Sequence, residues 1–241
     1  MSDREVNDFE VNDFEVNDLA SRRIEYETEG LDVADVEADP IVQWKRWYAD
    51  ATAANCTEPH AFVLSTIDAE GWPQSRYLLV RGADERGFAF FTNYESAKSQ
   101  QLAATGRASM LFTWLQLHRQ VRVVGTVERL PEQESDEYFA SRPRDSQIGA
   151  WSSPQSEPIP DRQWLEQRAE QMAATFGDGV ITRPTFWGGW LLRPHVFEFW
   201  QGRPSRLHDR IRYTAVSETA ISETAISETA SDGWQLSRLA P

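Results

Sequence analysis

Cysteine and lysine are scarce in this sequence of 241 residues. Cys56 is the only cysteine, and Lys45 and Lys98 are the only lysines beside 22 arginines. A single cysteine excludes an intrachain disulfide and a metal site built from a cysteine cluster. One thiol is typical of a protein from a reducing compartment, and we expect Cys56 to act as a small, partly buried hydrophobic residue.

Long hydrophobic runs are missing as well. No apolar stretch approaches the roughly 20 residues that a membrane-spanning helix needs, and the N-terminus lacks the basic-then-apolar pattern of a secretory signal. A hydrophobic fraction of 40%, with ten Trp and twelve Phe, excludes global disorder. The expectation is a cytoplasmic protein without membrane association, long enough for one sizeable core.

The sequence has fewer basic than acidic residues, and the excess of acidic residues lies in two segments. The formal net charge is −14, yet residues 1–39 hold fourteen acidic residues against three arginines, and residues 216–230 add three glutamates. The remaining residues carry equal numbers of acids and bases. A neutral body has no large basic face, so nucleic-acid binding is not expected, whereas single arginines around a small anionic ligand are possible.

Two acidic five-residue repeats mark the parts of the chain that tolerate insertions. Residues 5–19 read EVNDF-EVNDF-EVNDL, and residues 216–230 read VSETA-ISETA-ISETA. A period of five matches neither helix nor strand, which indicates tandem expansion in a tail and a loop tip. We therefore expect an acidic N-terminal tail over residues 1–39, part of it disordered, and one domain over residues 40–241 with a repeat loop at 216–230.

The rest of the sequence predicts short strands in hairpins together with a few helices. Apolar residues at helical spacing predict a helix over 41–54, and similar reasoning places helices over 95–104, 131–141 and 161–176. Alternation and turn residues predict strands over 61–67, 76–81, 88–92, 108–114, 120–130, 195–200, 209–214 and 233–239. This pattern indicates a mainly β, antiparallel barrel with packed helices. No glycine-rich phosphate loop is present, so side chains on strands would have to hold any nucleotide-like cofactor.

Three stretches contain more polar side chains than folding requires. Residues 76–81 are flanked by two arginines, and with residues 91–93 and Lys98 they suit a phosphate. Residues 141–156 read as a loop that is costly to order unless a ligand binds there, the alternative being a solvated connector. In residues 206–210, RLHDR, strand alternation would place Arg206, His208 and Arg210 on one face, which requires an anion or a carboxylate. Among the four histidines His208 is the functional candidate, whereas His60, His118 and His195 are expected to be ordinary polar residues.

At these residues the chain resembles the pyridoxine/pyridoxamine 5′-phosphate oxidase family, whose members use FMN to make pyridoxal 5′-phosphate. The most specific matches are SRPRDSQIGAW at 141–151 and the C-terminal EFWQ and RLHDR segments at 198–201 and 206–210. The resemblance runs from about Arg22 to the last residue. It implies an FMN-binding split β-barrel, antiparallel and α+β, that forms a homodimer with FMN at the subunit interface.

The resemblance also implies roles for individual residues. FMN would be bound by Arg76, Leu79, Phe91, Thr92, Lys98, Gln120, Gln155, Ser156, Trp200 and Arg210, with Gln155 and Ser156 reaching it from the partner subunit. The substrate would be bound by Arg23, Tyr26, Arg81, Tyr138, Arg142, Ser146, Arg206, Leu207 and His208, of which Arg206 and His208 would be catalytic and Arg23 and Tyr26 would belong to an N-terminal lid.

The implied reaction oxidises pyridoxine or pyridoxamine 5′-phosphate with O2, releasing H2O2 and, from the amine, ammonia. The flavin supplies the redox chemistry, so the protein needs neither a strong nucleophile nor a metal. The sequence departs from the family pattern at Arg81, where a lysine is usual, and at Ala97, where an arginine usually precedes Lys98 near the FMN phosphate. Loss of one charge-assisted contact at Ala97 predicts FMN binding weaker by roughly ten- to a hundredfold, unless a neighbour such as Ser96 or Ser99 compensates.

Two other functions are compatible with the same motifs. One is a related FMN oxidase of the same fold, of the phenazine-biosynthesis type, which shares the RLH ending. The phosphate-binding segment at 141–146 counts against it, because that segment favours a phosphorylated substrate. The other is a flavin- or haem-binding split-barrel protein without oxidase turnover, against which the C-terminal RLHDR segment argues.

Overall fold

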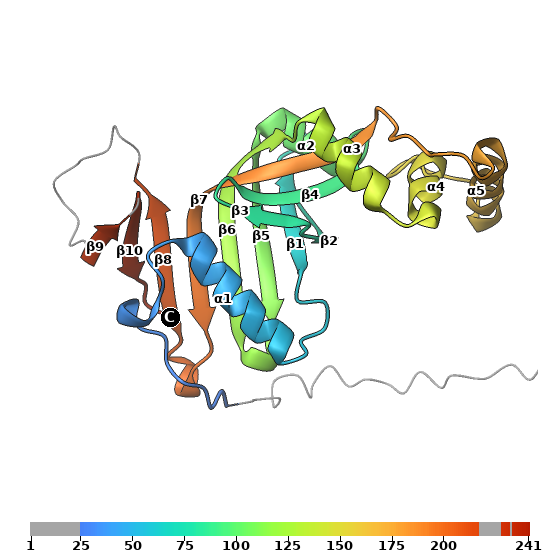
Figure 1. Ribbon diagram of the computed structural model, residues 1–241. Helices are drawn as coiled ribbons and strands as arrows, with labels where there is room; N and C mark the ends of the chain where they lie inside the picture. Colours follow the sequence, from blue (N-terminus) through green and yellow to red (C-terminus); the bar gives the residue numbers. More distant parts are fainter. Residues whose placement is uncertain (1–24, 217–227, 232) are drawn as a thin grey trace, which may run out of the picture.

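The fold is one curled antiparallel sheet with helices on one face and at one end, as the computed structural model shows (Figure 1). The structure describes residues 25–216, 228–231 and 233–241. The N-terminal repeat and most of the C-terminal repeat lie outside these residues. Within them, ten strands form one sheet in the order β2-β1-β5-β6-β7-β8-β10-β9, and β4 pairs with both β3 and β7.

The strands are β1 (Ala61–Ile67), β2 (Pro73–Leu79), β3 (Gly82–Asp84), β4 (Gly87–Asn93), β5 (Arg107–Trp114), β6 (Arg119–Arg129), β7 (Trp187–Gln201), β8 (Asp209–Ala215), β9 (Glu228–Ser231) and β10 (Trp234–Arg238). The helices are α1 (Pro40–Ala53), α2 (Ala97–Thr105), α3 (Glu132–Ser141), α4 (Arg144–Ser152) and α5 (Arg162–Phe176), with short 3-10 turns η2 (Val33–Asp35), η3 (Leu115–Leu117) and η4 (Pro204–Arg206). The expected antiparallel, mainly β architecture with packed helices is confirmed.

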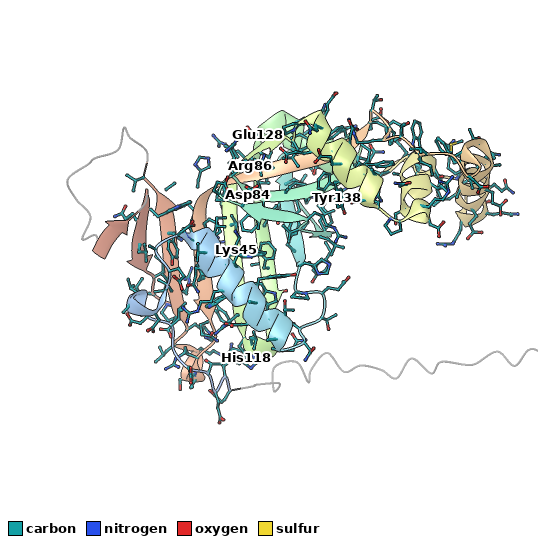
Figure 2. All side chains as sticks on the ribbon, in the orientation of Figure 1. Lys45, Asp84, Arg86, His118, Glu128 and Tyr138 are labelled. Carbon is teal, nitrogen blue, oxygen red and sulfur yellow. The ribbon has the colours of Figure 1, made fainter. Side chains whose placement is uncertain are left out.

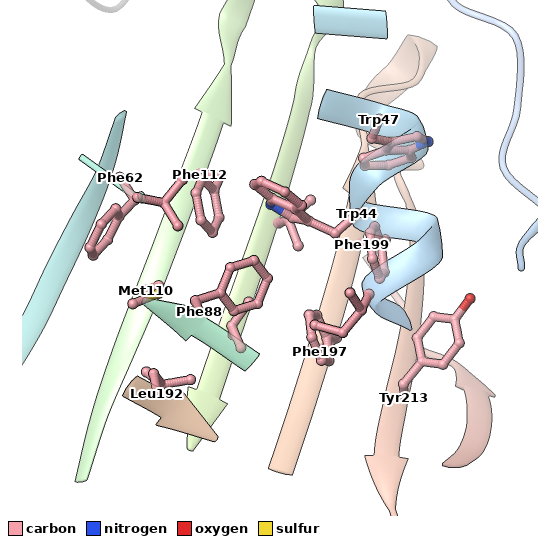
Figure 3. Packing of buried hydrophobic residues seen from close by; sticks show 14 of the residues in the cluster. Trp44, Trp47, Phe62, Phe88, Met110, Phe112, Leu192, Phe197, Phe199 and Tyr213 are labelled. Atoms are coloured by element: carbon pink, nitrogen blue, oxygen red, sulfur yellow. The ribbon is translucent and has the colours of Figure 1, made fainter. Parts of the chain in front are cut away.

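Helix α1 covers the concave face of the sheet and closes the core. Asp39 caps the helix by accepting a hydrogen bond from the amide of Ile41 at 2.7 Å, and Pro40 occupies the first turn, where its missing N–H costs nothing. The ring of Trp44 packs edge-on against Phe88 and Phe112, at centroid distances of 5.0 and 5.1 Å (Figure 3). Burying these aromatic side chains is the main stabilisation of the domain.

Strand β7 is longer than the sequence predicts, and it organises the sheet. The first half of β7 pairs with β4 and the second half pairs with β8. The whole of β6 pairs with residues 190–201 of β7. The sequence predicts this strand only over residues 195–200. Pro194 lies opposite Gly125, where the register between β6 and β7 shifts, and a bulge of this kind tolerates proline.

Two further predictions need correction. Residues 144–152 are helix α4 and not part of a loop, and the last three residues of the second repeat, 228–230, form strand β9 together with Ser231 on the edge of the sheet. Figure 1 shows α3, α4 and α5 in a row that extends away from one end of the sheet. Their contacts are made by a separate small core containing Phe139, Ile148, Ile181 and Trp187. None of the helices in the described ranges is long and apolar enough to cross a membrane.

Candidate active site

Two cations lie near each other between the sheet and the start of α2, and of these Lys98 is buried and Arg76 is half-buried. Lys98 is 9% exposed, and its Nζ donates to Gln155 Oε1 at 2.7 Å, to Ser96 Oγ at 3.1 Å and to Thr92 Oγ1 at 3.3 Å. Arg76 on β2 donates to Thr66 Oγ1 at 2.6 Å and to Gln101 Oε1 at 3.3 Å. All these acceptors are neutral, and in the described part of the chain neither cation has a carboxylate partner.

The pKa values of both groups reflect this unbalanced charge. Burial, and then the positive charge of Arg76, lowers the pKa of Lys98 to about 8. Burial also lowers the pKa of Arg76. Two cations held together in a desolvated place repel each other, and a bound anion would remove the repulsion. We call Arg76, Thr92, Lys98, Gln155 and Ser156 the phosphate cluster.

The N-terminus of α2 faces the same cluster. Ser96 precedes the helix but makes no side-chain cap, and the amide of Ala97 donates to Ser156 Oγ at 3.2 Å. Gln155 and Ser156 therefore contact Thr92, Lys98 and Ala97 of their own chain. The expectation that these two residues reach the cofactor from a partner subunit stays a prediction.

A second anion-binding arrangement adjoins the first. Arg142, at the end of α3, has a buried Nη1 atom without a hydrogen-bond partner. It lines a cavity of about 240 Å³ together with Ser146 of α4, Trp187 and Gln155. Burial lowers the pKa of Arg142, the charge of Tyr138 raises it, and the positive charge of Arg81 lowers it. We call Arg81, Tyr138, Arg142 and Ser146 the phosphate clamp.

Aromatic stacking positions the clamp. The ring of Tyr138 on α3 stacks on Phe91 of β4 at 3.9 Å, so these two predicted site residues contact each other. Helix α4 begins after Pro143 and carries Ser146 in its first turn. The polar segment 141–156 is therefore ordered by helix formation and by the small core beneath it, rather than by a ligand alone.

The C-terminal site residues gather elsewhere, at the far end of β7. Trp200 contacts the ring of His208 at 4.6 Å, and Tyr26 lies near both, at 6.3 and 5.9 Å between ring centroids. The Nδ1 atom of His208 accepts a hydrogen bond from the amide of Arg203 at 3.1 Å. Burial, and then the charge of Arg206, lowers the pKa of His208, so the ring is neutral at pH 7 and carries its proton on Nε2.

The segment RLHDR is not a continuous strand, which corrects the prediction for it. Ser205 and Arg206 have positive φ angles of 55° and 61°, and β8 begins only at Asp209. Of Arg206, His208 and Arg210, only Arg210 has a strand position, opposite Trp200, which in turn pairs with Gln120. Arg206 and Leu207 project from a tight turn and are exposed to solvent.

Arg210 is held by a buried carboxylate that the sequence analysis did not single out. Glu198 accepts from Arg210 Nε at 3.0 Å and Nη2 at 2.8 Å, and it also pairs with Arg122 and Arg212. Two other unpredicted residues are Gln101, which contacts Arg76, and Trp187, which contacts Arg142. Glu198 stands in the EFWQ segment quoted above, but the spacing of residues carries no signal of these contacts.

The predicted site residues thus form two groups at opposite ends of the sheet. The phosphate cluster and clamp lie where β7 begins, and the group of Tyr26, Trp200, His208 and Arg210 lies where β7 ends. Figure 2 shows this separation through Tyr138 on α3 at one end and His118 near the other. Strand β7 has 15 residues from Trp187 to Gln201, which corresponds to a length along the strand on the order of 45 Å.

The remaining predicted residues have distinct environments. Leu79 lies at the end of β2 beside a cavity of about 600 Å³, which is also lined by the exposed side chains of Tyr77 and Leu115. Arg23 lies outside the described residues. His118, expected to be an ordinary polar residue, stacks on Tyr26 at 4.2 Å. The described ranges contain no group of His, Cys, Asp and Glu that could hold a metal ion.

Comparisons with known proteins identify the family. The family model described as pyridoxamine 5′-phosphate oxidase matches residues 49–176, and that of the pyridoxine 5′-phosphate oxidase C-terminal dimerisation region matches residues 187–241. The pyridoxine/pyridoxamine 5′-phosphate oxidases of Burkholderia vietnamiensis and Cupriavidus taiwanensis are 49% and 48% identical to this chain, over 92% of this chain and 99% of each relative.

Solved structures agree on the fold. The structure of PhzG from Burkholderia lata 383, in complex with tetrahydrophenazine-1-carboxylic acid, is 30% identical with a TM-score of 0.76, covering 89% of this chain and 99% of that one. A pyridoxamine 5′-phosphate oxidase-related, FMN-binding protein from Nostoc punctiforme is 16% identical with a TM-score of 0.62, covering 82% and 97%. On these matches, the chain belongs to the pyridoxamine 5′-phosphate oxidase family.

Proposed function

We propose that this protein oxidises pyridoxine 5′-phosphate and pyridoxamine 5′-phosphate to pyridoxal 5′-phosphate, with FMN as cofactor and O2 as electron acceptor. The products besides pyridoxal 5′-phosphate are H2O2 and, from the amine, ammonia. One observation carries the proposal. Two anion-binding arrangements adjoin each other, the phosphate cluster and the phosphate clamp, and Gln155 contacts the first and lines the cavity of the second.

FMN fits the phosphate cluster on chemical grounds. Lys98 is buried and Arg76 is half-buried, and among the described residues both have neutral acceptors only, so a phosphate would supply the missing negative charge. Thr92, Gln155, Ser156 and the start of α2 would complete its hydrogen bonds. When bound, FMN supplies the hydride acceptor and the reaction with O2. Leu79, Phe91, Gln120, Trp200 and Arg210 would line the remainder of its site.

The clamp explains selection of a phosphorylated substrate. Arg142 presents a buried N–H without a partner, and the hydroxyls of Tyr138 and Ser146 and the guanidinium of Arg81 stand near it. A guanidinium can hold a phosphate through two parallel hydrogen bonds, and desolvation strengthens them. Arg206 and the neutral His208 would face the pyridine ring, where Arg206 would orient the ring and His208 would orient the substrate or a water.

Within one chain these residues do not form a single group. Arg206 and His208 follow the end of β7, whereas Arg142 contacts Trp187 at its start. We therefore propose a homodimer in which one protomer supplies the cluster and clamp and its partner supplies the Arg206 turn. The match of residues 187–241 to a family dimerisation region supports it. Closure by the N-terminal lid with Arg23 and Tyr26, and a cytoplasmic location, stay predictions.

The second candidate is an oxidase of the phenazine-biosynthesis type. The similarity to PhzG favours it. The relatives at 49% and 48% identity, which are pyridoxine/pyridoxamine 5′-phosphate oxidases, favour the phosphorylated substrate over the likeness to PhzG at 30% identity. The Arg142 guanidinium does not decide between them, because it would bind a carboxylate as well as a phosphate.

A single assay separates these functions. The protein is supplied with FMN, pyridoxine 5′-phosphate and O2, and pyridoxal 5′-phosphate and H2O2 are followed together. We expect both products in equal amounts, and we expect Arg206→Ala to abolish turnover while FMN stays bound. Absence of product from protein with an intact flavin spectrum contradicts the proposal and directs attention to the phenazine-type or non-catalytic alternatives.

A further inference from the structure

Trp187 is the buried residue around which the phosphate clamp is assembled. It begins β7, pairs with Asn93 of β4 and is 6% exposed. Its carbonyl accepts a hydrogen bond from Arg183 Nη1 at 2.7 Å, and the same guanidinium pairs with Asp136 of α3 at 2.6 Å. The strand and the helix that carries Tyr138 and Arg142 are thus held together at this residue.

The indole ring contacts the functional side chains directly. The guanidinium carbon of Arg142 lies 4.5 Å from the ring centroid, and the ring is nearly parallel to those of Phe91 and Tyr138, with interplanar angles of 13° and 10°. Trp187 also lines the cavity of about 240 Å³ that Arg142 and Ser146 share. One ring therefore supports two members of the clamp.

The chemistry of this support suits a site for an anion. A carboxylate partner would neutralise Arg142 and occupy its N–H groups. The face of an aromatic ring instead stabilises the cation and leaves the N–H groups free to bind phosphate. The unpartnered Nη1 of Arg142 agrees with this arrangement.

We propose that Trp187 is a positioning residue of the phosphate clamp, which holds Arg142 charged and oriented for the substrate phosphate. The proposal rests on the function proposed above and assigns to Trp187 the selectivity for phosphorylated over unphosphorylated vitamers.

The test compares Trp187→Leu and Trp187→Phe in the FMN-loaded protein. Loss of the ring in the leucine variant is expected to raise KM for pyridoxine 5′-phosphate by roughly 5- to 30-fold, the range of a desolvated cation–π contact, with kcat within about twofold. KM for unphosphorylated pyridoxine should not change. The ratio of kcat/KM for the phosphate ester to kcat/KM for pyridoxine should therefore fall. The phenylalanine variant keeps an aromatic face and should recover most of the affinity.

Trp47→Leu is the matched control. Trp47 is 2% exposed and also lies under an arginine, Arg119, at 4.5 Å, but on α1 and away from the clamp. This variant should lose thermal stability and keep its preference for the phosphate ester. The proposal is overturned if Trp187→Leu loses kcat/KM equally for both vitamers. It is also overturned if the kcat/KM ratio of phosphorylated to unphosphorylated vitamer falls as much in Trp47→Leu.

A binding measurement separates this proposal from the proposed function. Calorimetric titration with pyridoxal 5′-phosphate requires no turnover. Wild-type protein that binds this compound without oxidising pyridoxine 5′-phosphate refutes the oxidase function, and weaker binding by Trp187→Leu would still support the positioning role. Equal binding by wild type and Trp187→Leu refutes the positioning role, and absence of binding to wild type refutes both.

Discussion

Replacing Lys98 by methionine is expected to stabilise the FMN-free protein and to weaken FMN binding at the same time. The pKa of Lys98 falls from 10.5 to about 8 in the fold. Since each pH unit corresponds to about 1.4 kcal/mol, holding the charged ammonium costs the fold roughly 3 kcal/mol. Methionine removes this cost and fills a similar volume. Loss of the hydrogen bonds to Thr92, Ser96 and Gln155 offsets part of the gain, so we expect a net stabilisation of about 1–2 kcal/mol.

FMN binding should change in the opposite direction. A hydrogen bond to a charged group contributes about 1.5–3 kcal/mol, which corresponds to a roughly 10- to 150-fold higher Kd in Lys98→Met. Flavin fluorescence titration measures the Kd, and thermal unfolding of the FMN-free protein measures stability. A variant that is less stable without FMN, or that binds FMN as tightly as wild type, refutes the reasoning that Lys98 is a desolvated cation whose charge bound FMN neutralises.

The pH dependence gives an independent check. Below pH 8 the folded and unfolded chains both carry the Lys98 proton, and the full cost is present. Between pH 8 and 10.5 the folded chain releases the proton first, so the cost declines as pH rises and is gone above 10.5. The stability difference between Lys98→Met and wild type should therefore shrink over this interval. FMN affinity of the wild type should fall above about pH 8, because phosphate binds the protonated form.

Two further predictions concern substitutions elsewhere. Ala97→Arg places a guanidinium at the start of α2, beside the amide that contacts Ser156, and should lower the Kd for FMN by roughly ten- to a hundredfold in the same titration; an unchanged Kd would show that α2 and its neighbours already compensate. Gly87→Ala should destabilise the fold by roughly 3 kcal/mol in chemical denaturation, because φ is +134° and the new Cβ would collide with the backbone of β7. Gly106→Ala, whose φ is +63° in open space, is its control and should cost about 1 kcal/mol; equal losses would refute the collision.

Local sequence predicted the elements whose packing follows a simple period. In β6, Val121 and Val123 are buried and Arg122 is exposed, as their alternation predicts. Trp44 and Trp47 lie on the buried side of α1, as helical spacing predicts. Helix α4 was missed because its sequence is polar and its buried residue Ile148 packs against Phe139 and Trp187, which are distant in the chain or lie in other elements.

The sequence by itself determined the residue types of the site and, through its motifs, the family. Only the tertiary structure decided which of these residues meet. Arg76 on β2 contacts Gln101 of α2 and so lies near Lys98, and among the described residues neither cation has a carboxylate partner; Arg142 contacts Trp187 at the start of β7. Contacts of this kind join segments tens of residues apart, so the spacing of residues within one segment cannot predict them. The length of β7 places the RLHDR turn at the other end of the chain's own sheet, and this separation is the physical reason for proposing a second copy.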